Sequence, residues 1–152
     1  MTYDVRCDGD TINPWTYPDI MVKSPETGPG VQPYWYAHVI GIFHAFVLSS
    51  HLGVKEKMLH PMDFLWVHWF GMEPGPYRHR FCHACLPKIG FVESSDNYAF
   101  TFLDPAQVIR GVHIIPAFSE GRTSALLPVT KSVARILNPE EEDDWLNFYV
   151  NM

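Results

Sequence analysis

Cysteine is scarce in this chain of 152 residues, which has only Cys7, Cys82 and Cys85. A small secreted domain stabilised by disulfides usually carries a larger and even number, so the count argues against that class and favours a reducing compartment. An apolar run of the roughly 20 residues needed to cross a bilayer is also missing. The first residues lack the charged start and apolar middle of a secretory signal. We therefore expect a soluble, intracellular protein with no membrane contact.

Positive charge is in short supply as well. The chain has 11 lysines and arginines against 17 acidic residues, a formal net charge of −6. Binding nucleic acid through its phosphates needs a clustered basic face. The densest cationic stretch is short and runs from Arg78 to Lys88. Direct nucleic-acid binding is therefore weakly supported.

Common catalytic motifs are absent too. The chain has no Gly-x-Ser-x-Gly turn for a nucleophilic serine and no glycine-rich loop that would cradle a phosphate. Asp104 could serve in acid–base chemistry, but Pro105 follows it. This pair is better explained as the N-cap and first residue of a helical turn. These observations favour binding over catalysis.

Hydrophobic and aromatic residues, in contrast, are abundant, at 47% and 14% of the chain, enough for one substantial core. Residues 34–47 alternate: one parity is apolar throughout, and the other carries His38 and His44. Residues 62–71 alternate in the same way, with His68 opposite the apolar parity. Such alternation is typical of a half-buried β-strand. Two aromatic strands predict a β-rich core.

Turn and cap signals place the shorter elements. The further strands that we expect cover residues 19–23, 89–92, 98–102, 112–115 and 145–150. The two strands around Ser94–Asn97 are predicted to form a hairpin, because small polar residues favour a turn. A helical turn is expected after Asp104, and the spacing of apolar residues over 130–137 predicts a second short helix.

The predicted fold class is mainly β: a small barrel-like or strongly curved antiparallel sheet with one or two short helices. Prolines and glycines interrupt every run in residues 1–33, which we expect to form an extended N-terminal arm over the body. Residues 34–152 are then a single β-rich domain. Its last strand reaches the end of the chain, so we expect that strand to be truncated.

The nearest approach to a metal site is a short cluster made of His79, Cys82, His83 and Cys85. The two cysteines have C-x-x-C spacing, whereas structural zinc sites typically take four ligands from two separated pairs. A second pair would have to involve His60 or His113 in space. Zinc is thus the one cofactor that the sequence suggests, and chance clustering in a loop is the alternative.

Aromatic residues on the parity opposite the presumed core are the binding candidates. These are Tyr34, Tyr36, Trp66 and Phe70, with His38 and His68 on the same parity. An exposed aromatic wall can hold a methylated lysine through cation–π attraction. The alternative is a second packing face that uses both sides of the strands.

Blocks spread over nearly the whole chain carry a family resemblance. They include Tyr34-Trp-Tyr-Ala37, Val39-Ile-Gly-Ile-Phe-His-Ala45, Met62-Asp-Phe-Leu-Trp-Val67, Phe102-Leu-Asp-Pro-Ala-Gln-Val-Ile-Arg-Gly-Val-His113 and Phe148-Tyr-Val-Asn-Met152. These blocks resemble a domain of mushroom-forming fungi found near or within transposon-derived reading frames of the Plavaka and Kyakuja–Dileera–Zisupton kind. The order of the strands is also similar to that of bromo-adjacent homology modules, small β-barrels that bind chromatin partners.

The resemblance implies a non-catalytic accessory or interaction domain of fungal transposon origin. Its expected partner is a protein, either chromatin or a transposase, and the nucleus is among the expected locations. Two alternatives stay open. One is a metal-dependent hydrolase or nuclease that uses His44, His68, His113 and a nearby aspartate. The other is a decayed copy without present function, because Cys7 and Trp15, like His38 and His68, stand where relatives tend to have arginine.

Overall fold

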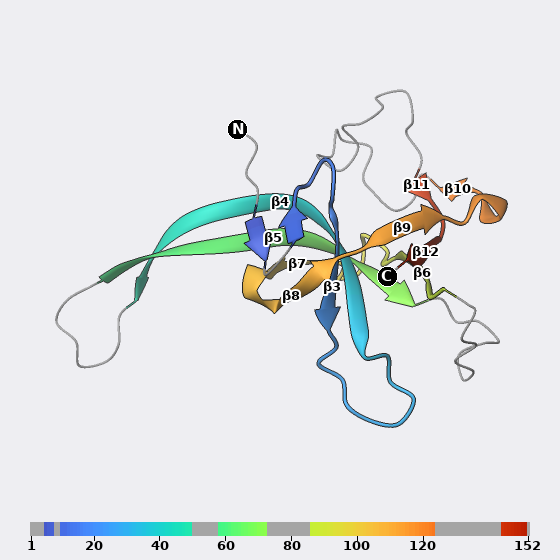
Figure 1. The fold of residues 1–152 in the computed structure, drawn as a ribbon, viewed down its shortest axis with the longest axis horizontal. Helices are drawn as coiled ribbons and strands as arrows, with labels where there is room; N and C mark the ends of the chain where they lie inside the picture. Colours follow the sequence, from blue (N-terminus) through green and yellow to red (C-terminus); the bar gives the residue numbers. More distant parts are fainter. Residues whose placement is uncertain (1–4, 8–9, 50–57, 73–85, 124–143, 152) are drawn as a thin grey trace.

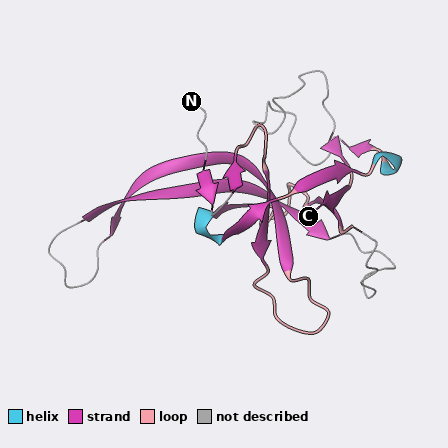
Figure 2. Cartoon of the chain, in the orientation of Figure 1, coloured by secondary structure: helices cyan, strands magenta, loops and turns pink. Residues whose placement is uncertain are grey.

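The computed structural model describes residues 5–7, 10–49, 58–72, 86–123 and 144–151, and it is mainly β, as predicted (Figure 1, Figure 2). The main sheet has eight strands. They are β3 (Asp19–Lys23), β4 (Tyr34–Ser49), β5 (Met58–Met72), β6 (Lys88–Phe91), β7 (Phe100–Leu103), β8 (Val108–Gly111), β9 (His113–Pro116) and β12 (Phe148–Asn151). All their pairings are antiparallel, in the order β8–β3–β4–β5–β6–β12–β9, and β7 also pairs with β5.

Small elements accompany this sheet. β1 (Val5–Cys7) pairs with β2 (Asp10–Ile12), and β10 (Arg122–Thr123) pairs with β11 (Asp144–Trp145). Two 3₁₀ turns, η1 (Pro105–Gln107) and η2 (Phe118–Glu120), are the helical elements of the described residues. Neither is long enough to cross a membrane. The predicted helix at 130–137 lies outside the described residues.

The sheet is not closed into a barrel, although its two end strands are joined directly in the chain. β8 pairs with β3 at one end of the sheet, and β9 pairs with β12 at the other. Only Val112 separates them, and its N–H donates to the carbonyl of Asp19 in β3. One continuous segment can reach both ends of a sheet only if the sheet curves, as predicted.

Both faces of the sheet are packed. The first core cluster contains Ile12, Ile20, Val22, Ala37, Val39, Leu65, Val67, Leu103 and Val108. The second contains Met21, Tyr36, Phe70, Ile89, Phe148 and Val150. Neighbouring residues of β3 alternate between the two clusters because successive side chains of a strand point to opposite faces. β3 and Ile12 thus belong to the sheet and its core, although they lie in the segment predicted as an extended arm.

A β-bulge in β4 changes which side chains share a face. The register between β4 and β5 shifts between Val39 and Gly41. Val39 lies in the first cluster, and beyond the bulge it is Ile42 that packs against this cluster. The prediction that the apolar parity of residues 34–47 stays on one face of the strand is therefore wrong, because one extra residue moves every later side chain to the other face.

The predicted hairpin at residues 89–102 is also wrong. β6 pairs with β5 at residues 70–72, and β7 pairs with β5 at residues 65–68. The two strands therefore lie end to end along one edge of β5. The turn between them forms as expected, since the Asp96 N–H donates to the Glu93 carbonyl. The turn therefore does not reverse the chain into a hairpin. It connects two strands that pair, one after the other, with the same edge of β5.

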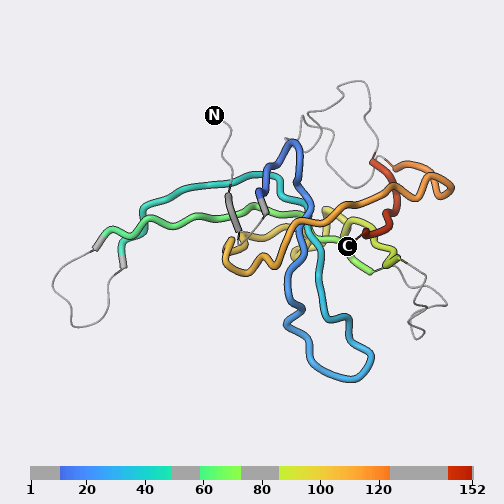
Figure 3. The backbone as a smooth tube through the Cα atoms, viewed as in Figure 1, coloured from blue at the N-terminus to red at the C-terminus, as the bar shows by residue number. Residues whose placement is uncertain are grey.

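β4 and β5 continue together well beyond their neighbours. β3 pairs with β4 only at residues 34–38, and β7 pairs with β5 only from Leu65 onward. Residues 43–49 and 58–64, here called the arm, pair with each other and with no other described strand. The two strands run side by side away from the rest of the chain (Figure 3).

Pro61 lies inside β5, one residue before the alternating segment 62–71 from which a strand was predicted. The backbone N–H and carbonyl of Trp69 bond to Ala99 and Val92, away from β4. Backbone groups alternate in direction along a strand, so those of Pro61 also face away from β4. The missing N–H of Pro61 thus falls on the outer edge, where proline is tolerated in a sheet.

Candidate functional site

The predicted aromatic wall is not an exposed surface. Tyr36 and Phe70 are buried and lie opposite each other in neighbouring strands. Burial also raises the pKa of the Tyr36 hydroxyl. Trp66 is half-buried, with its ring stacked on Phe100 at 5.9 Å between centroids, and only Tyr34 is exposed. The prediction of exposure is therefore wrong for Tyr36 and Phe70, which pack in the second core cluster with residues of β6 and β12.

His68 is also part of the packed interior. Its side chain is 1% exposed, and its ring lies between those of Phe91 and Phe100, with centroids 4.6 and 4.3 Å away. Nε2 lies 2.7 Å from the carbonyl oxygen of Val92, and since a carbonyl only accepts, Nε2 carries the proton. Burial lowers the pKa of this imidazole. A neutral, enclosed ring of this kind supports the sheet and offers no access to a ligand.

His38 faces His68 across β4 and β5 and has its own partner. Its Nδ1 lies 2.8 Å from the carboxylate of Asp19 in β3. Asp19 is buried, so this bond compensates a carboxylate that would otherwise be costly to remove from water. The bond links β3 to β4 and explains why a polar side chain occupies this position.

The histidines of the hydrolase alternative do not converge. His44 lies in the arm on the face of Ile42, whereas His68 lies on the opposite face. His113 is on β9, which is not a neighbour of β4 or β5 in the sheet. Among the described residues, no group of three or more His, Cys, Asp or Glu could hold a metal ion. The catalytic alternative gains no support from this part of the chain.

The candidate zinc ligands lie elsewhere. His79, Cys82, His83 and Cys85 fall in residues 73–85, outside the described ranges. Zinc at this cluster therefore stays a prediction.

The arm carries the most conspicuous exposed surface. Its exposed large apolar residues are Phe43, Phe46, Val47, Leu48, Leu59 and Met62. They occupy both faces of the arm: Leu48 lies opposite Leu59 on one face, and Ala45 lies opposite Met62 on the other. Phe46 is 76% exposed. Six large apolar side chains exposed on a two-stranded projection are typical of an interaction site.

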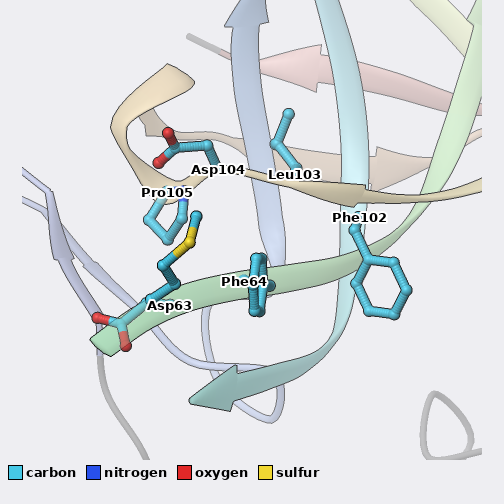
Figure 4. A pocket seen from close by; sticks show the side chains of 7 residues that line it. Asp63, Phe64, Phe102, Leu103, Asp104 and Pro105 are labelled. Atoms are coloured by element: carbon cyan, nitrogen blue, oxygen red, sulfur yellow. The ribbon is translucent and has the colours of Figure 1, made fainter. Parts of the chain in front are cut away.

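A hollow lies beside the arm where β7 ends (Figure 4). It has a volume of about 520 Å³ and is lined by Met62, Asp63, Phe64, Phe102, Leu103, Asp104 and Pro105. Phe64 and Phe102 meet edge to face, with centroids 6.2 Å apart. The Asp63 carboxylate lies 2.5 Å from Nδ1 of His44, and Asp104 accepts the Ala106 N–H, which confirms its role as a cap. The hollow thus combines an apolar floor with two carboxylates.

Sequence reasoning missed both the arm and the hollow. A signal for the arm was present in the alternating segment 34–47, which is much longer than the length of about 5 or 6 residues most common for a strand. In the structure β4 has 16 residues and β5 has 15. Strands this long project past shorter neighbours. The hollow had no such signal, because Phe64 and Phe102 come from segments far apart in the chain.

No family model, curated protein or solved structure matches the chain.

Proposed function

We propose that this chain is a non-catalytic interaction domain that binds another protein through the arm. The observation that carries the proposal is the set of six large apolar side chains exposed on both faces of residues 43–49 and 58–64. An isolated two-stranded hairpin is at best marginally stable in water, and this one lacks further strands along its length among the described residues. A partner that covers these side chains would remove apolar surface from water and stabilise the arm.

The arm differs from the rest of the described chain, here called the body, in how much apolar surface it exposes. The body buries two apolar clusters on opposite faces of the sheet and holds His38 and His68 in structural bonds. The arm buries little and exposes much. The accessory role and fungal transposon origin implied by the family resemblance agree with this proposal, and chromatin and transposase are the first partners to test.

Site-specific photo-cross-linking tests the proposal. A photoreactive amino acid is placed at Phe46 and, in a control protein, at Tyr98, which is exposed in the turn between β6 and β7. We expect position 46 to yield a cross-link to one protein that is absent at position 98. The substitution Leu59→Ser, on the same face as Phe46, should abolish it.

Thermal unfolding of the Leu59→Ser variant serves as the control for folding. Since Leu59 is exposed, its midpoint should match that of the parent protein. Equal cross-linking at positions 46 and 98, or cross-linking that survives Leu59→Ser, would contradict the proposal.

A further inference from the structure

The outer edge of β4 in the arm is a strand edge beside which no other described strand lies. β3 pairs with β4 only at residues 34–38, and beyond the bulge β5 is the one described strand that pairs with β4. Residues 43–48 are all exposed, so the described elements leave both faces beside this edge open. Within the described residues, β4 therefore has a neighbouring strand on one side only along the arm.

The backbone groups on this edge follow from the register with β5. Residues directly opposite each other in an antiparallel pair direct their N–H and C=O groups either toward each other or both outward. Those of Pro61 face away from β4, and Pro61 lies opposite Phe46. The N–H and carbonyl of Phe46 therefore face away from β5, and by alternation so do those of Ile42 and Leu48. Such a row of alternating donors and acceptors is matched by the backbone of an added β-strand.

The two edges of the arm differ in their protection against an added strand. Proteins commonly protect a free edge with proline or charged residues. The outer edge of β5 is interrupted by Pro61, and Asp63 adds a charge to the same strand. The segment 42–48 of β4 contains no proline, glycine, lysine, arginine, aspartate or glutamate. An edge without these devices, on the same arm as an edge that has them, indicates that β4 receives a strand.

We propose that this strand comes from a second copy of the chain, so that segments 42–48 of two chains form the centre of a four-stranded antiparallel sheet. The pairing uses both β4 edges and leaves the two β5 strands outermost, each interrupted by Pro61. A two-fold dimer of this kind is closed. A strand from another protein has no such built-in stop. Four strands also exceed the two that are at best marginally stable in water.

The side chains fit a pairing centred on Ala45. In this register Phe43 lies opposite Val47 of the second copy, on one face of the sheet. Ile42 lies opposite Leu48 on the other face, and apolar cross-strand pairs of this kind stabilise antiparallel strands. The antiparallel direction places the two bodies at opposite ends of the shared sheet, because each arm runs away from its own body (Figure 3).

The dimer goes beyond the proposed function and is compatible with it. Strand pairing uses backbone groups along one edge of the arm. The apolar side chains on the two faces of the four-stranded sheet stay available to another protein.

Two substitutions at Phe46 test the dimer by sedimentation equilibrium of the full chain over a concentration series. Phe46→Pro removes an N–H that faces away from β5, so the ladder between β4 and β5 keeps its hydrogen bonds. Phe46→Ser loses the same aromatic side chain but keeps this N–H. We expect the parent chain to dimerise. The dissociation constant of Phe46→Pro should exceed that of Phe46→Ser about thirtyfold, since two inter-chain hydrogen bonds are lost.

A cysteine cross-link tests the register independently of the proline. The two Ala45 residues form a non-hydrogen-bonded pair at the two-fold axis, with Cα atoms about 4.5 Å apart. We expect Ala45→Cys to give a covalent dimer on mild oxidation, because this separation permits a disulfide. Val47→Cys is the matched control, since the two copies of this residue are offset by four strand positions, about 13 Å. Peptide mass spectrometry identifies which cysteines are linked.

The inference is overturned if the parent chain stays monomeric throughout the series, or if Phe46→Pro and Phe46→Ser dimerise equally. It is also overturned if Ala45→Cys forms no link between the two positions 45, or if Val47→Cys links as readily.

The fate of this inference is separable from that of the proposed function, because cross-linked products of twice the chain mass report the second copy. A monomeric chain that cross-links to a different protein at position 46 overturns the dimer and leaves the proposed function standing. A dimer that cross-links to no different protein overturns the proposed function and leaves the dimer.

Discussion

His68 has a structural role, although a histidine on the presumed exposed face of a strand suggests a binding or catalytic one. Its imidazole is enclosed by two phenylalanine rings, and its N–H satisfies the Val92 carbonyl. The pKa of the ring is lowered, and burial is the largest cause. The folded state therefore binds a proton less readily than the unfolded state, and this difference links stability to pH.

The predicted consequence is a loss of stability in mild acid. The contribution of His68 is fully present above its unfolded pKa of about 6.5 and is lost as the pH falls from there toward the lower folded pKa. We expect the free energy of unfolding, measured in denaturant by circular dichroism, to decrease over this range. His68→Gln keeps an N–H donor but does not titrate, so its curve should be flatter. A His68→Gln variant with the slope of the parent protein would refute this account.

Gly121 is a residue whose role depends on its backbone conformation. Its φ of 84° is in the region that favours glycine, and a Cβ built there would meet no atom within 4 Å. Gly121→Ala should therefore cost about 1 kcal/mol of unfolding free energy from backbone strain alone. Gly71→Ala in β5 is the matched control, because its φ is not positive and its Cβ would make only ordinary contacts. Equal losses in both variants, measured by denaturant titration, would exclude strain as the cause.

At the scale of elements, β5 combines fully buried positions with strongly exposed ones. Leu65 is 0% exposed in the first core cluster, whereas Leu59 in the arm is 62% exposed. Leu65→Ala should lower the free energy of unfolding by about 2–5 kcal/mol, because it leaves a cavity. Leu59→Ala should change it by about 0.5 kcal/mol or less. Comparable losses in denaturant titrations would mean that the arm is packed against something within the folded chain.

The elements also show how far the sequence predicts this fold. β3, β4, β5 and the η1 cap were predictable, because alternation and an Asp-Pro pair are local signals. The bulge after Val39 was not, since only pairing with β5 reveals it. The end-to-end placement of β6 and β7 also depends on which strand they choose as partner. Of the residues that line the hollow, the sequence pointed to Asp104, and it assigned this residue only the role of an N-cap.

At the scale of the whole molecule, the two core clusters share the same strands. β3, β4 and β5 each contribute side chains to both clusters, so neither can be dismantled without exposing the other. We therefore expect the body to unfold in one cooperative step. Far-ultraviolet circular dichroism and tryptophan fluorescence should give the same transition in denaturant. Separate transitions in the two signals would show that the clusters are independent units.

Pro61 has a consequence for how such an arm survives in a crowded solution. An apolar strand with an open edge is a template on which further chains add as strands, and repeated addition leads to fibrils. Pro61 removes one hydrogen-bond donor from the middle of the outer edge of β5, so a continuous ladder cannot form along it. The arm can thus present apolar side chains to a partner while this edge is protected against aggregation.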